Sequence, residues 1–237
     1  MIWEGARPPH LVDGPFFWEN REIMSVKVKI CGITNEEDAV WAVNLGAHYL
    51  GLNFYSKSPR KVSPELAARI VKKAPPFVPC VGVFVDHPVD QIVKVVQQTG
   101  LMGIQLHGDG YTPEDCGFFR DHLEESILLV KVFRVAVVAD LDILGSYKEV
   151  VPYFLLDTRN EGELGGTGKT FPWELAMRAR AFGPKLFLAG GLTPENVRGA
   201  VEQAQPFAVD VASGVEKSPK RKDYDRMRKF MDEAKRG

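Results

Sequence analysis

The sequence predicts an α/β protein that folds as a single (β/α)8 TIM barrel, and two observations lead to this prediction. From residue 26 onward, short apolar runs rich in β-branched residues alternate eight times with segments of helical periodicity. Residues 25–237 thereby give about 27 residues to each repeat, the size of a compact βα unit in such a barrel. A doubly wound sheet of eight strands stays open as the alternative, because periodicity does not separate the two architectures.

The predicted strands are hydrophobic along their whole length rather than at alternate positions. This pattern is typical of parallel strands that are buried on both faces. The eight predicted strands are Val26–Cys31, His48–Phe54, Val78–Val85, Met102–Leu106, Ile127–Phe133, Tyr153–Leu156, Lys185–Ala189 and Phe207–Val211.

The segments between the strands have the helical period, and three of them start with a capping pair. Ser63, Thr112 and Thr193 are each followed by proline and then glutamate, residues that are preferred at a helix N-terminus. The eight predicted helices are Glu36–Leu45, Pro64–Lys73, Val89–Gln98, Pro113–Leu123, Ala139–Lys148, Phe171–Phe182, Pro194–Gln203 and Asp223–Lys235.

The composition is that of an ordinary globular protein, with 45% hydrophobic and 26% charged residues. The 30 Lys and Arg residues nearly balance the 31 Asp and Glu residues, so no overall field attracts a nucleic acid or a membrane surface. No apolar run approaches the roughly 18 residues of a membrane span. We therefore expect a small-molecule ligand, and if it is anionic, local groups must hold it.

The three cysteines, Cys31, Cys80 and Cys116, are too few and too scattered for a disulfide framework or a zinc site. Since the N-terminus also lacks a signal-peptide pattern, we expect a cytoplasmic protein, either a monomer or a homodimer. Residues 1–24 lie outside the repeat. Because Met24 offers a natural start, we expect this extension to be dispensable and residues 25–237 to form the catalytic domain.

Active-site groups of a barrel lie at the carboxyl ends of its strands and in the loops that follow. These positions hold no H-x-H or H-E-x-x-H motif and no His/Cys cluster, so we predict no metal and no other cofactor. The residues found there are Cys31, Asn53, Arg60, Asp86, Gln105, His107, Arg134, Asp157, Gly190, Gly191, Asp210, Ser213 and Gly214.

Small residues follow the last two predicted strands and point to a phosphate site. Gly190 and Gly191 follow the seventh strand, and Ser213 and Gly214 follow the eighth. Glycine lets backbone N–H groups approach an anion closely, and these two loops form the usual phosphate site of a barrel. The alternative is that the glycines serve only turns with positive φ. Their occurrence on adjacent strands favours phosphate binding.

The glycine-rich segment Gly162–Thr170 resembles a P-loop but does not fit one. The motif needs glycine at position 163, where this chain has Glu163, and the segment follows the sixth strand rather than the first. We interpret it as a lid over the barrel mouth, with Lys169 near its hinge.

Cys31 and Asp157 are the candidate acid–base pair. A lone cysteine that ends an apolar strand is often only a small buried hydrophobe, and an aspartate after an apolar run can simply cap the next loop. A carboxylate at such a position is nevertheless costly unless it is paired or functional. A base and an acid across a barrel mouth would suit proton transfer on a phosphorylated sugar. From the residues alone, the reaction is that of a phosphosugar isomerase or lyase.

Nine segments together resemble the phosphoribosylanthranilate isomerase family of tryptophan biosynthesis. They follow the family's order over residues 26–236, which is essentially the whole chain outside the N-terminal extension. The matching segments are Lys27–Thr34 (KVKICGIT), Gly51–Phe54 (GLNF), Ser58–Arg60 (SPR), Val81–Val85 (VGVFV), Ile104–Gly108 (IQLHG), Leu155–Asp157 (LLD), Gly165–Phe171 (GGTGKTF), Leu188–Leu192 (LAGGL) and Val209–Glu216 (VDVASGVE).

The resemblance implies an Amadori rearrangement of N-(5-phosphoribosyl)anthranilate to 1-(2-carboxyphenylamino)-1-deoxyribulose 5-phosphate. It implies that Cys31 is the general base and Asp157 the general acid. Because the pKa of a free cysteine is about 8.5, the base needs a cationic or dipolar environment to be a thiolate near neutral pH. The resemblance also implies that Arg60 meets the anthranilate carboxylate and Asp210 orients sugar hydroxyls. The other implied mouth residues are Gln105 and His107.

Without the resemblance, Arg60 would be a solvated loop charge, Asp210 a strand-end cap and His107 a structural histidine. We interpret the basic run Lys217–Lys222 as a solvated face that mildly attracts anions. Other phosphate-binding barrels, ribulose-phosphate epimerase and indole-glycerol-phosphate synthase, are the enzyme alternatives, but the metal-ligating histidines and the lysine pair that they need are missing at matching positions. A non-catalytic phosphosugar-binding barrel is the remaining alternative, and the intact Cys31 and Asp157 argue against it.

Overall fold

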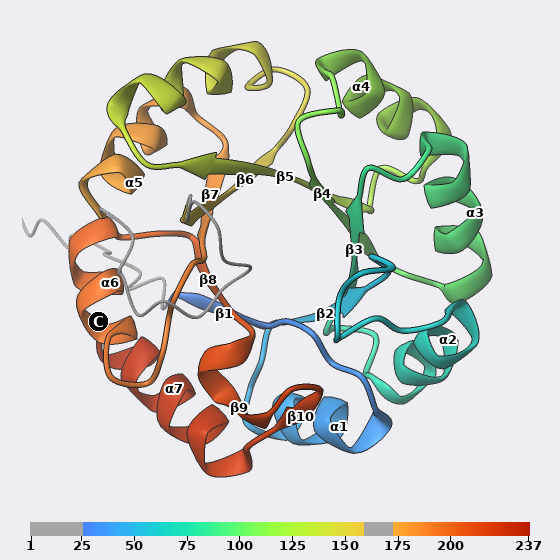
Figure 1. The fold of residues 1–237 in the computed structure, drawn as a ribbon, viewed down its shortest axis with the longest axis vertical. Helices are drawn as coiled ribbons and strands as arrows, with labels where there is room; N and C mark the ends of the chain where they lie inside the picture. Colours follow the sequence, from blue (N-terminus) through green and yellow to red (C-terminus); the bar gives the residue numbers. More distant parts are fainter. Residues whose placement is uncertain (1–25, 159–172) are drawn as a thin grey trace, which may run out of the picture.

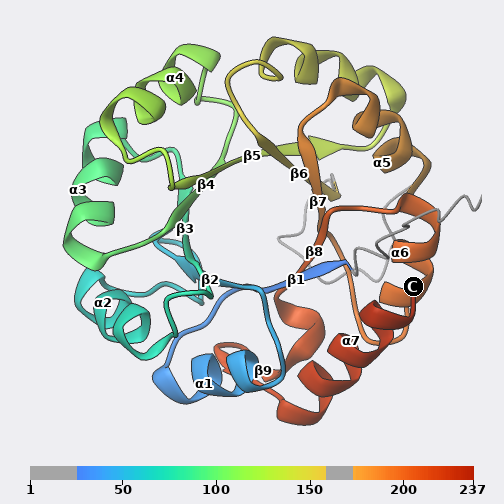
Figure 2. The ribbon, with the colours of Figure 1, turned by 180° about the vertical axis from the view of Figure 1, so that it is seen from behind.

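The computed structural model describes residues 26–158 and 173–237, and it confirms the predicted barrel. Eight parallel strands close in the order β1-β2-β3-β4-β5-β6-β7-β8, so the doubly wound sheet is excluded (Figure 1). Seen from either end, the helices surround the strands (Figure 2). The strands are β1 Lys27–Ile30, β2 Tyr49–Asn53, β3 Cys80–Val85, β4 Gly103–His107, β5 Leu128–Val135, β6 Tyr153–Thr158, β7 Lys185–Leu188 and β8 Ala208–Val211.

Two of the three predicted helix caps form as expected. The Ser63 side chain accepts a hydrogen bond from the Leu66 N–H, and Thr112 forms a capping box with Asp115. The α-helices are α1 Glu36–Asn44, α2 Pro64–Lys73, α3 Val89–Thr99, α4 Pro113–His122, α5 Trp173–Ala179, α6 Val197–Ala204 and α7 Tyr224–Arg236.

At the third predicted cap, the Thr193 Oγ1 does accept a hydrogen bond from the Glu195 N–H, but the α-helix does not start there. The Asn196 Oδ1 accepts a hydrogen bond from the Thr193 N–H, and the Asn196 Nδ2 donates to the Gly191 carbonyl oxygen. These bonds hold residues 193–196 as a turn, because an asparagine side chain competes with the helical pattern for backbone partners. Helix α6 consequently begins at Val197 instead of Pro194.

The helix predicted between the fifth and sixth strands is also wrong in type. Residues 138–146 form a 3-10 helix, η1, instead of an α-helix. The Asp140 carboxylate accepts hydrogen bonds from the N–H groups of Ala136 and Val137, which tightens the first turn. Gly145 and Ser146 are also weak helix formers near the end of the segment.

An element that we did not predict follows β8. A short 3-10 helix, η3 (Ser213–Val215), leads into an antiparallel hairpin of β9 (Glu216–Ser218) and β10 (Arg221–Lys222). Figure 1 shows this hairpin beside α1. The Lys222 N–H donates to the carboxylate of Asp38 on α1, and the hydroxyl of Thr34, in the loop before α1, donates to the Lys220 carbonyl oxygen. The end of the repeat is thereby joined to its beginning.

The hydrophobic core has two layers. The larger lies between the strands and the helices, and the smaller fills the lower part of the barrel lumen. Because side chains alternate along a strand, the residues two positions further along from the lumen cluster also point inward. The buried members of the lumen cluster are Tyr49, Val81, Val130, Val132, Leu155, Phe187, Ala189 and Ala208.

No helix within residues 26–158 or 173–237 is long and apolar enough to cross a membrane.

Candidate active site

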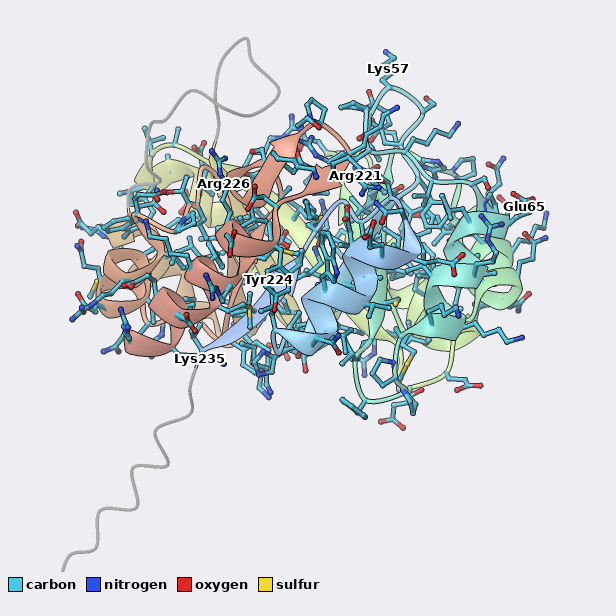
Figure 3. The ribbon with its side chains drawn as sticks, turned by 90° about the horizontal axis from the view of Figure 1, so that it is seen from below. Lys57, Glu65, Arg221, Tyr224, Arg226 and Lys235 are labelled. Carbon is cyan, nitrogen blue, oxygen red and sulfur yellow. The ribbon has the colours of Figure 1, made fainter. Side chains whose placement is uncertain are left out.

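The upper part of the barrel lumen is polar. Counting two residues forward from Leu155 and Ala208 of the lumen cluster leads to Asp157 and Asp210, and the same alternation places Lys29 and Cys31 inward from β1. Figure 3 shows the barrel from the side, with Lys57 of the loop after β2 and Lys235 of α7 at opposite ends. The polar residues lie toward the end marked by Lys57, where the carboxyl ends of the strands meet.

Cys31 directly follows β1. Its backbone N–H donates to the Val211 carbonyl oxygen over 2.8 Å, so the strand register holds it beside β8. A Cβ atom at Gly51 would lie 2.6 Å from the Cys31 Sγ, which explains why the neighbouring strand has glycine there. Burial raises the pKa of the Cys31 thiol above its ordinary value, although the Lys29 ammonium opposes this rise. The cationic surroundings that we expected are present, but burial has the larger effect on the pKa.

Lys29 is buried beside this thiol and forms an ion pair. Its Nζ lies 2.9 Å from the Asp210 Oδ1, and the two side chains are 1% and 8% exposed. The strand register aligns Lys29 directly with Asp210 across β1 and β8. The alternative interpretation, that Asp210 only caps the end of a strand, is therefore wrong. Instead, Asp210 points into the lumen.

Asp157 lies near the carboxyl end of β6, in register with Arg134 on β5, and its side chain is partly exposed. Strands β7 and β8 separate β6 from β1 on one side of the closed barrel, and four strands separate them on the other. Asp157 and Cys31 thus approach the lumen from different walls of the barrel. A substrate between them would have one on each side.

Gln105 and His107 form a pair on β4. The Gln105 Nε2 and the His107 Nε2 are 2.9 Å apart, while no group in the described part of the chain bonds the buried Gln105 Oε1. Burial, together with the nearby Lys29 and Arg134 charges, lowers the pKa of His107 to about 3. His107 is therefore neutral near neutral pH, and the site can use it as a hydrogen-bonding group but not as a cation.

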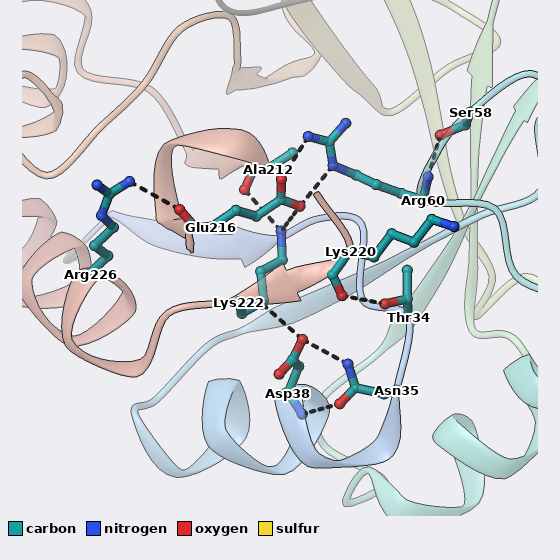
Figure 4. A network of polar contacts seen from close by, with 10 residues as sticks. All are labelled: Thr34, Asn35, Asp38, Ser58, Arg60, Ala212, Glu216, Lys220, Lys222 and Arg226. Atoms are coloured by element: carbon teal, nitrogen blue, oxygen red, sulfur yellow. Dashed lines mark hydrogen bonds and ion pairs between the residues drawn. The ribbon is translucent and has the colours of Figure 1, made fainter. Parts of the chain in front are cut away.

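Arg60 is held by a buried carboxylate that we did not single out in the sequence. Its Nε and Nη2 donate to the two oxygens of Glu216, over 2.8 and 2.7 Å (Figure 4). Burial alone would raise the pKa of Glu216, but Arg60 and Lys222 outweigh it, so the pKa is lowered and the carboxylate stays ionised. The Nη1 side of the guanidinium is bonded to no group in the described part of the chain. Arg60 is therefore a positioned cation and not a solvated loop charge.

Lys222 corrects our interpretation of the basic run as a solvated face. Its side chain is fully buried, and its Nζ donates to the Glu216 carboxylate over 3.1 Å and to the Ala212 carbonyl oxygen over 2.9 Å (Figure 4). Lys217 and Lys220 are exposed, as expected. The hairpin β9–β10 turns the chain back so that one lysine of the run points inward.

The loops after β7 and β8 lie against each other. Gly190 and Gly191 have φ values of +89° and +68°, so the turn does need glycine there. Gly214 has no positive φ, and glycine is needed there for a different reason: a Cβ atom would collide with the Leu192 carbonyl oxygen of the neighbouring loop. No turn or loop hydrogen bond within the described chain uses the N–H of Gly190, Gly191 or Gly214. Ser213 is exposed at the start of η3.

Several expectations concern segments beyond the described residues. The extension 1–24 and the proposed lid Gly162–Thr170, with Lys169, lie there.

All three cysteines are unpaired thiols. Within residues 26–158 and 173–237, no three His, Cys, Asp or Glu side chains gather in a way that could hold a metal ion.

Sequence reasoning missed three functional candidates: Lys29, Glu216 and Lys222. Lys29 lies two residues before Cys31 on the same predicted strand, so the alternation of side chains predicts that its charge faces the same side as the Cys31 thiol. Glu216 and Lys222 offered no comparable signal, because their burial depends on a hairpin that the hydrophobic pattern does not indicate.

Comparisons with known proteins agree on one family. The family model described as N-(5'phosphoribosyl)anthranilate (PRA) isomerase matches residues 28–233. Proteins named N-(5'-phosphoribosyl)anthranilate isomerase from Trichlorobacter lovleyi and Thermotoga maritima are 46% and 45% identical to this chain, over 89% of its length and 98% of theirs.

Solved structures give the same result. The crystal structure of phosphoribosyl anthranilate isomerase from Thermotoga maritima is 44% identical and superimposes with a TM-score of 0.82, over 89% of this chain and 98% of that one. A phosphoribosyl anthranilate isomerase in complex with reduced 1-(o-carboxyphenylamino)-1-deoxyribulose 5-phosphate is 42% identical, has a TM-score of 0.78 and shares the same coverage.

Proposed function

Because this chain belongs to the N-(5'-phosphoribosyl)anthranilate isomerase family, we propose that Cys31 and Asp157 are the base and the acid of its reaction. The family carries out an aldose–ketose isomerisation in tryptophan biosynthesis, the rearrangement of N-(5-phosphoribosyl)anthranilate to 1-(2-carboxyphenylamino)-1-deoxyribulose 5-phosphate. The observation that carries the assignment is the position of both groups, which face inward at the carboxyl ends of β1 and β6.

The reaction needs two proton transfers at different atoms of the sugar. Asp157 gives its proton to the ring oxygen, and the C1–O bond breaks as the lone pair of the anthranilate nitrogen forms a C1=N bond, which leaves a protonated imine (an iminium). The Cys31 thiolate then takes the proton from C2, and the electron pair of that C–H bond forms the C1–C2 double bond of an enolamine. Tautomerisation of the enolamine gives the ketone at C2. Because the two groups lie on different walls, each can reach its own atom of one bound sugar.

The binding groups follow from the same geometry. Arg60, fixed by Glu216, keeps its Nη1 side for the anthranilate carboxylate, where a guanidinium can bind bidentately. The buried Gln105 Oε1 is suited to accept a hydrogen bond from a sugar hydroxyl, with His107 beside it and Asp210 across the lumen. The N–H groups of Gly190, Gly191, Ser213 and Gly214 would bind the phosphate.

Replacing each group separately tests the assignment. Cys31→Ser and Asp157→Asn keep size and shape but cannot transfer the proton, so kcat should fall by on the order of 10²–10⁴ while KM stays near that of the parent protein. The assay follows the change of anthranilate fluorescence during turnover. Cys116→Ser is the matched control, since this thiol is buried on α4, outside the lumen. If folded Cys31→Ser turns over at nearly the parent rate, Cys31 is not the base.

The pKa of Cys31 adds a pH dependence to this test. Because burial raises that pKa, the thiolate fraction grows as the pH rises through neutrality, and kcat should grow with it. Cys31→Ser should lose this rising limb, whereas Asp157→Asn should keep it and lose only the falling limb that deprotonation of the acid causes.

We further propose that the enzyme acts in the cytoplasm as a monomer or a homodimer. The match to a family of tryptophan biosynthesis supports the location, and a relative from Thermotoga maritima is described as dimeric. Cell fractionation and light scattering of the full chain test the two statements separately.

A further inference from the structure

The role of Lys29 is not explained by the two proton transfers. A lysine that is only 1% exposed has lost its hydration, and burying a charge in this way is costly unless the site uses it. The packing around it does not need a lysine, because the cluster that fills the lumen is aromatic and aliphatic. Its charge at this place thus calls for a functional explanation.

Lys29 lies between the thiol and a carboxylate. It is two residues before Cys31 on β1, so both side chains face the lumen, and its Nζ is 2.9 Å from Asp210 on the adjacent strand β8. The other charged groups that act on Cys31 are Lys222, from the hairpin, and Arg60, from the loop after β2. Both of these cations share the single carboxylate of Glu216, which offsets one of their two charges, and Lys29 acts on Cys31 more strongly than Lys222 does.

We propose that Lys29 is a positioning residue that supplies the counter-charge for the Cys31 thiolate, and that Asp210 holds its ammonium in place. This inference rests on the proposed role of Cys31 as the base. As the thiolate forms, the ammonium between two anions gains a second partner without moving from the first. Asp210 has a dual effect, because it fixes the ammonium but also repels the thiolate.

The protonation of both groups agrees with this arrangement. Burial would lower the pKa of Lys29, but the Asp210 carboxylate and the Cys31 thiol outweigh it, so the pKa is raised and the ammonium persists. For Cys31, burial and Asp210 raise the pKa of the thiol, and Lys29 is the strongest group that lowers it. Loss of Lys29 should therefore remove the main force that favours the thiolate.

The test titrates Cys31 directly, without turnover. The full chain is alkylated with iodoacetamide across a pH series, and the Cys31 peptide is followed by mass spectrometry. Lys29→Met should raise the midpoint pH of alkylation by about 1–3, which makes alkylation near neutral pH at least about tenfold slower. Asp210→Asn should lower the midpoint, since it removes a negative charge while leaving Lys29. Lys27→Met, one inward position below Lys29 on the same strand, should leave the midpoint and kcat unchanged.

Midpoint shifts of opposite sign in Lys29→Met and Asp210→Asn distinguish an electrostatic role from a disturbance of the lumen, because a disturbance would shift both midpoints in the same direction. A midpoint in Lys29→Met equal to that in Lys27→Met, or a midpoint in Asp210→Asn that is unchanged or raised, would overturn the inference. If Lys29→Met does not fold, Asp210→Asn alone decides. If the shifts occur as expected but Cys31→Ser remains active, the counter-charge is real and the catalytic assignment of Cys31 is what fails.

Discussion

Replacing Glu216 with glutamine should destabilise the barrel far more than replacing a surface carboxylate. The two oxygens of Glu216 accept from the Arg60 Nε and Nη2 over 2.8 and 2.7 Å and from the Lys222 Nζ over 3.1 Å. Glutamine keeps the shape but leaves two cations close together, one of them fully buried. Removing one member of a buried ion pair typically costs about 3–5 kcal/mol.

The exposure of the partners decides where in that range the loss falls. The Arg60 side chain is 22% exposed, so water offsets part of its unpaired charge, and we expect a loss of about 3 kcal/mol. In a domain of this size, such a loss lowers the Tm by about 6–12 °C. Unfolding in urea, followed by circular dichroism, measures the free energy directly. Glu37→Gln is the control, because its ion pair with Arg221 is exposed and such pairs contribute about 0–1 kcal/mol.

The pH dependence gives a second measurement on the same variant. Because the pKa of Glu216 is lowered in the folded protein, the stabilisation is present at neutral pH and is lost as the pH falls through that pKa. The stability difference between the parent protein and Glu216→Gln should therefore shrink in acid. A loss at neutral pH no larger than that of Glu37→Gln would refute the view that Glu216 anchors the two cations.

Two further changes test the phosphate site and the N-terminal extension. Gly191→Ala should raise KM for the phosphorylated substrate, because the added Cβ obstructs the approach of the phosphate to the backbone N–H groups. Gly183→Ala is the control and should leave KM unchanged, because Gly183 also has a positive φ but lies in open space before β7. Equal KM values in the two variants would place the phosphate elsewhere. A chain of residues 25–237 should match the full chain in kcat and in unfolding free energy, and a loss above about 1–2 kcal/mol would mean that the extension packs on the barrel.

The hydrophobic pattern was sufficient to locate the strands, because most of their residues are apolar and buried on both faces, although β1 has two lysines among its four residues. It was not sufficient where side chains decide the backbone, as at Asn196, which holds the residues before α6 as a turn, and at Asp140, which tightens the start of η1. Such competition between side chain and backbone depends on a few hydrogen bonds that periodicity does not reveal.

The candidate site could likewise be predicted only in part from the sequence. The strand ends located Cys31, Asp157 and Asp210, since a parallel barrel brings all carboxyl ends to one face. The partners of these residues come from distant segments: Lys29 is paired with a residue 181 positions further along the chain. A single sequence contains no trace of a pairing at that distance, and the hairpin that buries Lys222 was not predicted at all.

The distance between Lys29 and Asp210 also matters during synthesis of the protein. A ribosome makes Lys29 among the first residues of β1 but adds its carboxylate partner Asp210 near the end, with β8. Until then, a nascent chain that buried β1 would bury an uncompensated ammonium, at a cost of several kcal/mol. This cost destabilises a closed but incomplete barrel formed by the early segments. Closure is favoured only when β8 arrives, which makes a contact of very long range the last to form and the slowest to be found.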